Sequence, residues 1–162
     1  MHLIVRRARL RGNPGVKDIA VDGGVFVAIE DRIEEYGNKE IDAGGNLVSA
    51  PFIDPHLHLD AALSEGSPRS NMSGTLLEGI AIWGERRQNL TKEELLRNAR
   101  EAVLWEVASG VQAIRTHADT TDSSLLAVEA LLELKGEMEG VADIQVVAFP
   151  QDGVFTFPEG EG

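Results

Sequence analysis

Alternating apolar runs and helical patterns in the second half of the chain constrain its fold more than any other sequence feature. Thr91-Lys-Glu-Glu94 has the form of a capping box, and the apolar stripe of the helix that it opens stops at Gly110. Residues 111–117 then read as a strand, residues 122–139 as an amphipathic helix and residues 143–149 as another strand. Because the connections are long enough to hold a helix, this order predicts βαβ units and a parallel sheet whose strands are buried on both faces.

Two histidines one residue apart follow an earlier apolar run at residues 46–53, which reads as a buried strand. Side chains alternate between faces along a strand, so His56 and His58 point the same way and can bind one metal ion together. Neutral imidazole is the commonest protein ligand for a catalytic metal, and we favour this interpretation. The alternative is a pair of histidines that caps the strand by hydrogen bonding, because a catalytic metal needs further ligands.

The composition excludes several classes of protein. The 27 acidic and 15 basic residues give a formal net charge of -12, which argues against nucleic acid or an anionic membrane as a partner. The chain has no cysteine, which excludes disulfides, thiolate metal sites and thiol nucleophiles. The N-terminus lacks the residue order of a signal peptide, and no stretch approaches the roughly 20 apolar residues of a membrane span. We therefore expect a cytoplasmic protein.

Residues 1–49 differ in character from the rest of the chain. Glycine-rich turn signals separate short β-branched pieces, such as residues 19–21 and 25–29, and predict a small β meander. Its strands carry too few apolar residues for a core of their own, so we expect it to pack on another part of the protein. Further along, a polar connection at residues 64–74 is expected to lie over the site, and a helical pattern follows at residues 75–88.

Four segments carry a resemblance to a known family: residues 51–60, 73–80, 114–119 and 143–153. Through these segments the chain resembles the amidohydrolase superfamily, and within it the cytosine deaminase family, along nearly its whole length. The resemblance implies an α/β fold in which about three strands form the N-terminal part of a (β/α)8 TIM-like barrel, preceded by a small β-rich segment. The expected domains are a small β-sandwich segment at 1–49 and the first βα units of the metal-dependent hydrolase barrel at 50–162.

The resemblance also implies roles for individual residues. His56 and His58 would bind one divalent metal ion, iron or zinc. Gln151 would bind the amide edge of a pyrimidine, and Leu76 would help to shape the substrate pocket. Without the family, Gln151 reads more simply as a turn residue.

Other residues near the motifs have structural interpretations. His117 is expected to be a hydrogen-bonded structural histidine near the site, because the family draws no ligand from its motif. Asp60 and Asp119 are expected to orient neighbouring groups around the metal ligands. Trp83 and Trp105 fall within helical patterns and read as core residues.

The family's reaction is hydrolytic deamination, in which a divalent metal lowers the pKa of a bound water for attack on the ring carbon that bears the amino group. We therefore expect an enzyme that converts cytosine to uracil and ammonia. The alternative within the family is another cyclic amide or amino-heterocycle as the substrate. The expected partners are a small-molecule substrate, and a second copy of the chain in a homo-oligomer when full length, with neither nucleic acid nor a membrane.

The catalytic set is incomplete in this chain. The family's two proton-shuttling carboxylates and two further histidines belong to strands beyond the third, whereas the acidic residues after the third strand are Asp152, Glu159 and Glu161. We therefore expect no catalytic residue within this chain and interpret it as the N-terminal portion of a protein of about 400 residues. The alternative is a natural, non-catalytic product that acts as an assembly partner.

Overall fold

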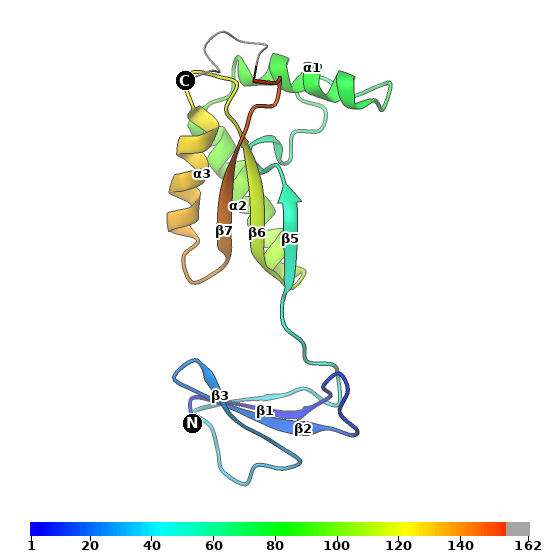
Figure 1. The fold of residues 1–162 in the computed structure, drawn as a ribbon, viewed down its shortest axis with the longest axis vertical. Coiled ribbons are helices and arrows are strands. Elements are labelled where there is room, and N and C mark those ends of the chain that lie inside the picture. Colours follow the sequence, from blue (N-terminus) through cyan, green and yellow to red (C-terminus); the bar gives the residue numbers. More distant parts are fainter. Residues whose placement is uncertain (155–162) are drawn as a thin grey trace. The chain divides into compact units, whose positions relative to one another are not determined.

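The computed structural model describes residues 1–154, so Glu159 and Glu161 lie outside the described residues. The chain divides into two compact units, Met1–Ala50 and Pro51–Gly162. The first unit consists of strands, and the second alternates strands with helices (Figure 1). No helix in the described part of the chain is long and apolar enough to span a membrane.

The first unit is a four-stranded sheet of order β3-β2-β1-β4. Its strands are β1 (Leu3–Ala8), β2 (Lys17–Asp22), β3 (Val25–Glu30) and β4 (Lys39–Asp42). The predicted meander is present, because β2 is antiparallel to both β1 and β3. The sequence did not predict β4, which pairs in parallel with β1.

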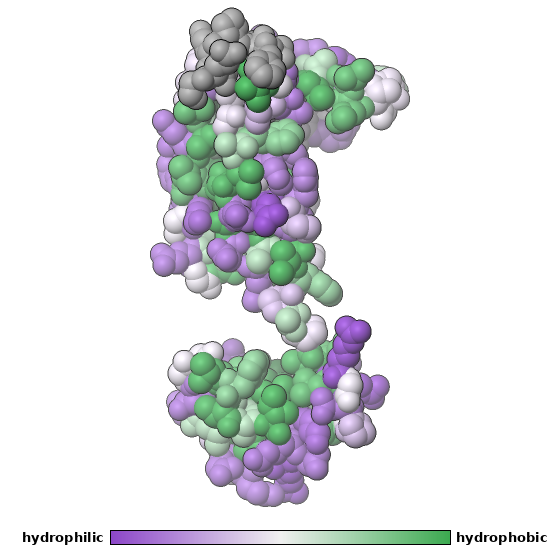
Figure 2. All heavy atoms as spheres, viewed as in Figure 1, coloured by the Kyte–Doolittle hydropathy of each residue, from purple (hydrophilic) through white to green (hydrophobic). Residues whose placement is uncertain are grey.

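The apolar core of the first unit is small. Its buried residues Ile4, Ala20 and Ile33 form one cluster. By contrast, Phe26 and Val25 on β3 are 72% and 62% exposed, and Figure 2 shows apolar side chains on the surface of this unit. The small core and the exposed apolar side chains agree with the expectation that residues 1–49 pack on another part of the protein. That packing stays a prediction.

The second unit contains a three-stranded parallel sheet. Its strands β5 (Phe52–Leu57), β6 (Val111–Asp119) and β7 (Asp143–Phe149) lie side by side in that order. Both neighbouring pairs are parallel, which confirms the predicted βαβ order.

Helices cover one face of this sheet. Two of them, α2 (Lys92–Ala108) and α3 (Leu126–Glu137), pack against each other and against the strands. A short 3-10 helix, η1 (Leu59–Ala61), follows β5, and α1 (Leu76–Arg87) lies beyond the carboxyl ends of the strands (Figure 1). The core between helices and sheet includes Leu95, Val103, Ile114, Leu131, Leu134 and Ile144.

Both α1 and α2 begin at a threonine N-cap, and the sequence predicted the one at Thr91. Thr75 Oγ1 accepts a hydrogen bond from the backbone N–H of Glu78 at 3.3 Å, and Thr91 Oγ1 accepts one from Glu94 N–H at 3.2 Å. After α2 the chain turns at Gly110, whose φ of +91° is accessible to glycine at little cost. The helical boundaries thus follow from local residue chemistry.

Two predictions about the sheet are wrong. The first strand begins at Phe52 and not at residue 46, because Val48 N–H donates to the carbonyl of Arg9 and holds this stretch to the first unit. The strands are also not buried on both faces. Arg115 on β6 and Gln145 on β7 are exposed, whereas their neighbours Ile114 and Ile144 are buried under α2 and α3, which cover one side of the sheet.

Two helical predictions also need correction. The third helix begins at Leu126 and not at Asp122, because the Asp122 carboxylate accepts hydrogen bonds from the N–H and hydroxyl groups of Ser124 and holds a turn there. Trp105 is 57% exposed and donates to Glu101 on the outside of α2, so it is not a core residue. Trp83 is partly buried and packs against the core, as predicted.

Candidate metal centre

Three histidines converge at the carboxyl ends of β5 and β6. His56 lies in β5, His58 follows the last residue of that strand, and His117 lies two residues before the end of β6. The ring centroids of His56 and His117 are 4.1 Å apart, and that of His58 is 5.3 Å from the first and 5.6 Å from the second. One nitrogen of each ring lies within 4.8 Å of the others. Parallel pairing of β5 with β6 thus brings a distant histidine to the predicted pair.

The alternation of side chains along β6 explains why His117 joins this cluster. Ile114, Thr116 and Ala118 are buried on the helix-covered face, so His117 points to the opposite face of the sheet. The sequence predicts a hydrogen-bonded structural histidine at this position. That role stays a prediction, and the Nδ1 atom of His117 is buried and has no hydrogen-bond partner among residues 1–154.

The electrostatics of the cluster favour a neutral imidazole at His58. Burial lowers the pKa of His58, and the neighbouring rings of His56 and His117 lower this pKa further. Neutral imidazole is the form that binds a metal. Three imidazoles that each offer one nitrogen, with Nδ1 of His117 buried and without a partner among the described residues, fit a divalent ion that accepts imidazole ligands, such as zinc or iron.

Buried polar side chains fix the chain that follows β5. Thr116 Oγ1 accepts a hydrogen bond from Leu59 N–H at 3.0 Å, and Asp60 Oδ2 accepts one from Asp119 N–H at 2.8 Å. The other oxygen of Asp60 lies 4.0 Å from Nδ1 of His58. Burial raises the pKa of Asp60 to about 6. Asp60 therefore lies where it can orient His58, although that role stays a prediction.

Asp119 joins this end of β6 to α1. Its Oδ2 accepts hydrogen bonds from Trp83 Nε1 at 2.7 Å and from Arg87 Nη1 at 3.1 Å. Burial alone would raise the pKa of Asp119, but hydrogen bonds from Thr121, Trp83 and Arg87 outweigh it and lower the pKa. Nothing in the residue pattern singles out Arg87, because a basic residue in the last turn of a helix is ordinarily explained by the helix dipole.

The two predicted substrate-binding residues differ in their surroundings. Gln151 is half-buried in the turn after β7, two residues beyond Phe149. The ring of Phe149 packs edge-on against His58, with centroids 5.2 Å apart, so this turn begins at the histidine cluster. Leu76 is the first residue of α1 and is 77% exposed. The substrate-binding roles of both residues stay predictions.

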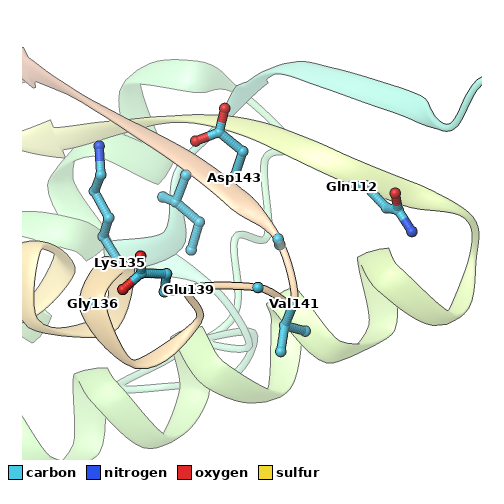
Figure 3. A pocket seen from close by; sticks show the side chains of 9 residues that line it. Gln112, Lys135, Gly136, Glu139, Val141 and Asp143 are labelled. Atoms are coloured by element: carbon cyan, nitrogen blue, oxygen red, sulfur yellow. The ribbon is translucent and has the colours of Figure 1, made fainter. Parts of the chain in front are cut away.

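An open pocket of about 610 Å³ lies elsewhere in the second unit (Figure 3). Its lining includes Gln112 near the start of β6, Asp143 at the start of β7, and Lys135 and Glu139 at the end of α3. These are the amino ends of the strands, whereas barrel enzymes carry their active sites at the carboxyl ends. The pocket is therefore separate from the histidine cluster.

A parallel α/β sheet with a histidine cluster at its carboxyl edge is typical of a barrel enzyme with a metal site. The amidohydrolase family profile matches residues 39–162. N-isopropylammelide isopropyl amidohydrolase of Pseudomonas sp. (strain ADP) is 36% identical over 168 residues, an alignment that covers 98% of this chain and 41% of that protein. The chain therefore belongs to the amidohydrolase family, and it spans less than half the length of this relative.

Solved structures agree with this assignment. 5-Methylcytosine deaminase from Klebsiella pneumoniae, liganded with 5-fluorocytosine, is 38% identical with a TM-score of 0.89, over 97% of this chain and 38% of that chain. N-isopropylammelide isopropylaminohydrolase from Burkholderia multivorans shares the fold at 23% identity and a TM-score of 0.79, over 99% of this chain and 41% of that chain. The predicted fold class is confirmed: the parallel sheet is the N-terminal part of a TIM-like barrel, preceded by a small β-rich sheet.

Proposed function

We propose that the protein that carries this chain is a metal-dependent hydrolase that removes an amino group from a nitrogen heterocycle, with cytosine as the preferred substrate. The observation that carries this proposal is the convergence of three imidazoles from adjacent strands, with nitrogens within 4.8 Å of one another, at the carboxyl edge of the sheet. Membership of the amidohydrolase family and 38% identity with 5-methylcytosine deaminase support the reaction class.

In this proposal His56 and His58 hold one divalent ion, zinc or iron, and His117 offers a third nitrogen on the same face. The ion, when bound, lowers the pKa of water and so supplies a nucleophile at neutral pH. The chain itself favours the neutral form of His58 and places a carboxylate near it. Burial lowers the pKa of His58, and the Asp60 carboxylate lies 4.0 Å from its Nδ1.

Gln151 is the proposed contact for the substrate ring. A primary amide both donates and accepts hydrogen bonds, which matches the adjacent donor and acceptor groups on the edge of a pyrimidine. The carboxylates that move protons onto the leaving amine would come from strands beyond β7. Complete turnover therefore requires residues outside this chain.

A second candidate is the release of an alkylamine from a ring. It rests on the relative named N-isopropylammelide isopropyl amidohydrolase, which is 36% identical over 98% of this chain. Both reactions break a bond between a ring carbon and an exocyclic nitrogen, so the same metal centre could serve either. The substrate pocket would decide between them.

Product analysis of the full-length protein, loaded with zinc or iron, tests the proposal. The substrates are cytosine, 5-methylcytosine and N-isopropylammelide, and the measured products are ammonia and isopropylamine. The double variant His56→Ala/His58→Ala gives the amine release that does not depend on the proposed metal ligands. We expect the highest kcat/KM for ammonia release from cytosine. Release of isopropylamine alone would assign the second candidate, and no amine from any of the three compounds would contradict the proposal.

A further inference from the structure

One side chain connects three elements around the histidine cluster. Arg87, in the last turn of α1, donates from Nη1 to Asp119 at 3.1 Å and from Nη2 to Asp152 at 2.6 Å. Asp119 ends β6, and Asp152 lies in the turn after β7. The side chain of Arg87 is only 19% exposed, and those of Asp119 and Asp152 are 5% and 17% exposed. Partly buried pairs of this kind are screened less by solvent than surface pairs.

Both partners of Arg87 adjoin residues of the candidate site. Asp119 follows His117 by two residues, and Asp152 is the neighbour of Gln151. The turn also has its own hydrogen bonds, from Asp152 N–H to Thr121 Oγ1 at 3.2 Å and from Gly153 N–H to the carbonyl of residue 150 at 2.9 Å. Arg87 adds the ionic link between this turn and the end of β6.

We propose that Arg87 is a positioning residue for substrate recognition. By holding Asp152 against Asp119, it fixes the turn that carries Gln151 at a set place beside the histidine cluster. This inference rests on the proposed function, because it assumes that Gln151 contacts the heterocycle. Arg87 itself touches neither the substrate nor the metal ligands in this proposal.

The planar fork of arginine suits this bridging role. It presents separate N–H groups to two carboxylates at once, whereas the compact ammonium group of lysine reaches one of them well. Arg87→Met should release the turn from β6, and Arg87→Lys should restore part of the link. Asp152→Asn should release the turn while leaving the contact between Arg87 and Asp119 in place.

Steady-state kinetics on the full-length, metal-loaded protein give the first readout. We expect Arg87→Met and Asp152→Asn to raise KM for the heterocycle by about tenfold or more with a smaller change in kcat, because displacement of a binding group by about 1 Å can cost up to 100-fold. Arg87→Lys should fall between wild type and Arg87→Met. Metal content should be the same in all of these proteins.

A matched control lies in the same turn of α1. Arg86 has only 6% of its side chain exposed, but it pairs with Glu94 on α2 at 2.9 Å and not with the turn after β7. Arg86→Met should leave KM unchanged. Equal increases in KM for Arg86→Met and Arg87→Met would mean that loss of α1 stability, and not release of the turn, is responsible, and would overturn the proposal.

Amide hydrogen exchange of residues 149–154 separates this proposal from the proposed function. We expect Arg87→Met and Asp152→Asn to speed exchange in this segment relative to wild type and Arg86→Met, whatever the substrate is. Unchanged exchange, or faster exchange without any change in KM, would overturn the positioning role. If the wild type releases no amine from any heterocycle, but the two variants still exchange faster than the wild type, the proposed function is wrong and the link made by Arg87 is not.

Discussion

At the scale of single residues, the candidate metal centre depends on the pairing of β5 with β6 as well as on sequence spacing. His56 and His58 are adjacent in the motif, but the third imidazole comes from β6, and its Nδ1 is buried without a hydrogen-bond partner among the described residues. An unpaired buried polar atom is costly, and a metal ion would satisfy it. The same burial lowers the pKa of His58 and favours its metal-binding form.

Removing the paired histidines should therefore abolish metal binding. We expect His56→Ala/His58→Ala to lose stoichiometric zinc or iron after dialysis, because loss of even one supporting group typically weakens metal affinity by about 10–100-fold. Elemental analysis of the purified full-length protein measures this directly. His2→Ala, which removes the remaining histidine outside the cluster, is the control and should keep its metal. A double variant with wild-type metal content would show that these residues are not ligands.

Asp18 gives the first unit a dependence on pH. Burial alone would raise the pKa of Asp18, but hydrogen bonds from the backbone N–H groups of Arg7 and Ile33 and from the Arg6 guanidinium outweigh it and lower the pKa. A carboxyl whose pKa is lowered by folding stabilises the folded state above its unfolded pKa of about 3.9, and this contribution is lost as the pH falls through the lower, folded value.

We therefore expect Asp18→Asn to destabilise the first unit at pH 7 by about 2 kcal/mol, because it removes charged acceptors from buried donors. Its thermal stability should also fall less steeply than that of the wild type below pH 4. Thermal unfolding measured across pH 3–7 tests both points, and Asp22→Asn, at the exposed end of the same strand, is the control. If the thermal stability of wild type and of Asp18→Asn fell equally steeply below pH 4, this account would be contradicted.

At the scale of elements, local chemistry was enough to predict α1, α2, β6 and β7. The N-cap Thr91 could be recognised because a cap acts within one turn of its own helix. The start of α3 was missed because Asp122 bonds to Ser124 and holds a turn ahead of the helix. The place of His117 and the bridge made by Arg87 depend on which strands pair, and a residue pattern along one segment does not carry that information.

Two glycines in the second unit allow the effects of backbone conformation and of packing to be tested separately. Gly110 has φ +91° at the link from α2 to β6, whereas Gly136 lies within α3, where an added Cβ would meet no described atom within 4 Å. We expect Gly110→Ala to destabilise the protein by about 1–2 kcal/mol, and Gly136→Ala to stabilise it by about 0.5–1 kcal/mol. Melting temperatures of the two variants should therefore move in opposite directions from wild type. A shift of the same sign in both would contradict the argument.

At the scale of the whole molecule, the second unit leaves part of its sheet without a covering layer among the described residues. Phe52 and Ile53 on β5 are more than half exposed, and Arg115 and Gln145 pair at 2.8 Å on adjacent strands of the face that helices do not cover. Apolar and polar side chains mix on the exposed surface of this unit (Figure 2). Open parallel sheets of this kind are unusual, because their edges and faces invite association.

The size of the native protein distinguishes two explanations of how this surface is covered. The chain spans 41% of the length of its amidohydrolase relative from Pseudomonas. We therefore predict that an antibody raised against this chain detects a protein of roughly 45 kDa in its source, the mass of a complete barrel with its β-rich segment. In such a protein the remaining strands would cover the open face of β5–β7 and supply the missing carboxylates.

A band at 17.5 kDa would point the other way. The cell would then make the short chain itself, with two or three metal ligands and no complete catalytic set, and the exposed edges of β5 and β7 would favour an assembly partner over an enzyme. Size-exclusion chromatography of the native species distinguishes the two cases further. A short chain that eluted as a stable monomer would contradict an assembly partner, whereas elution as a larger assembly would support one.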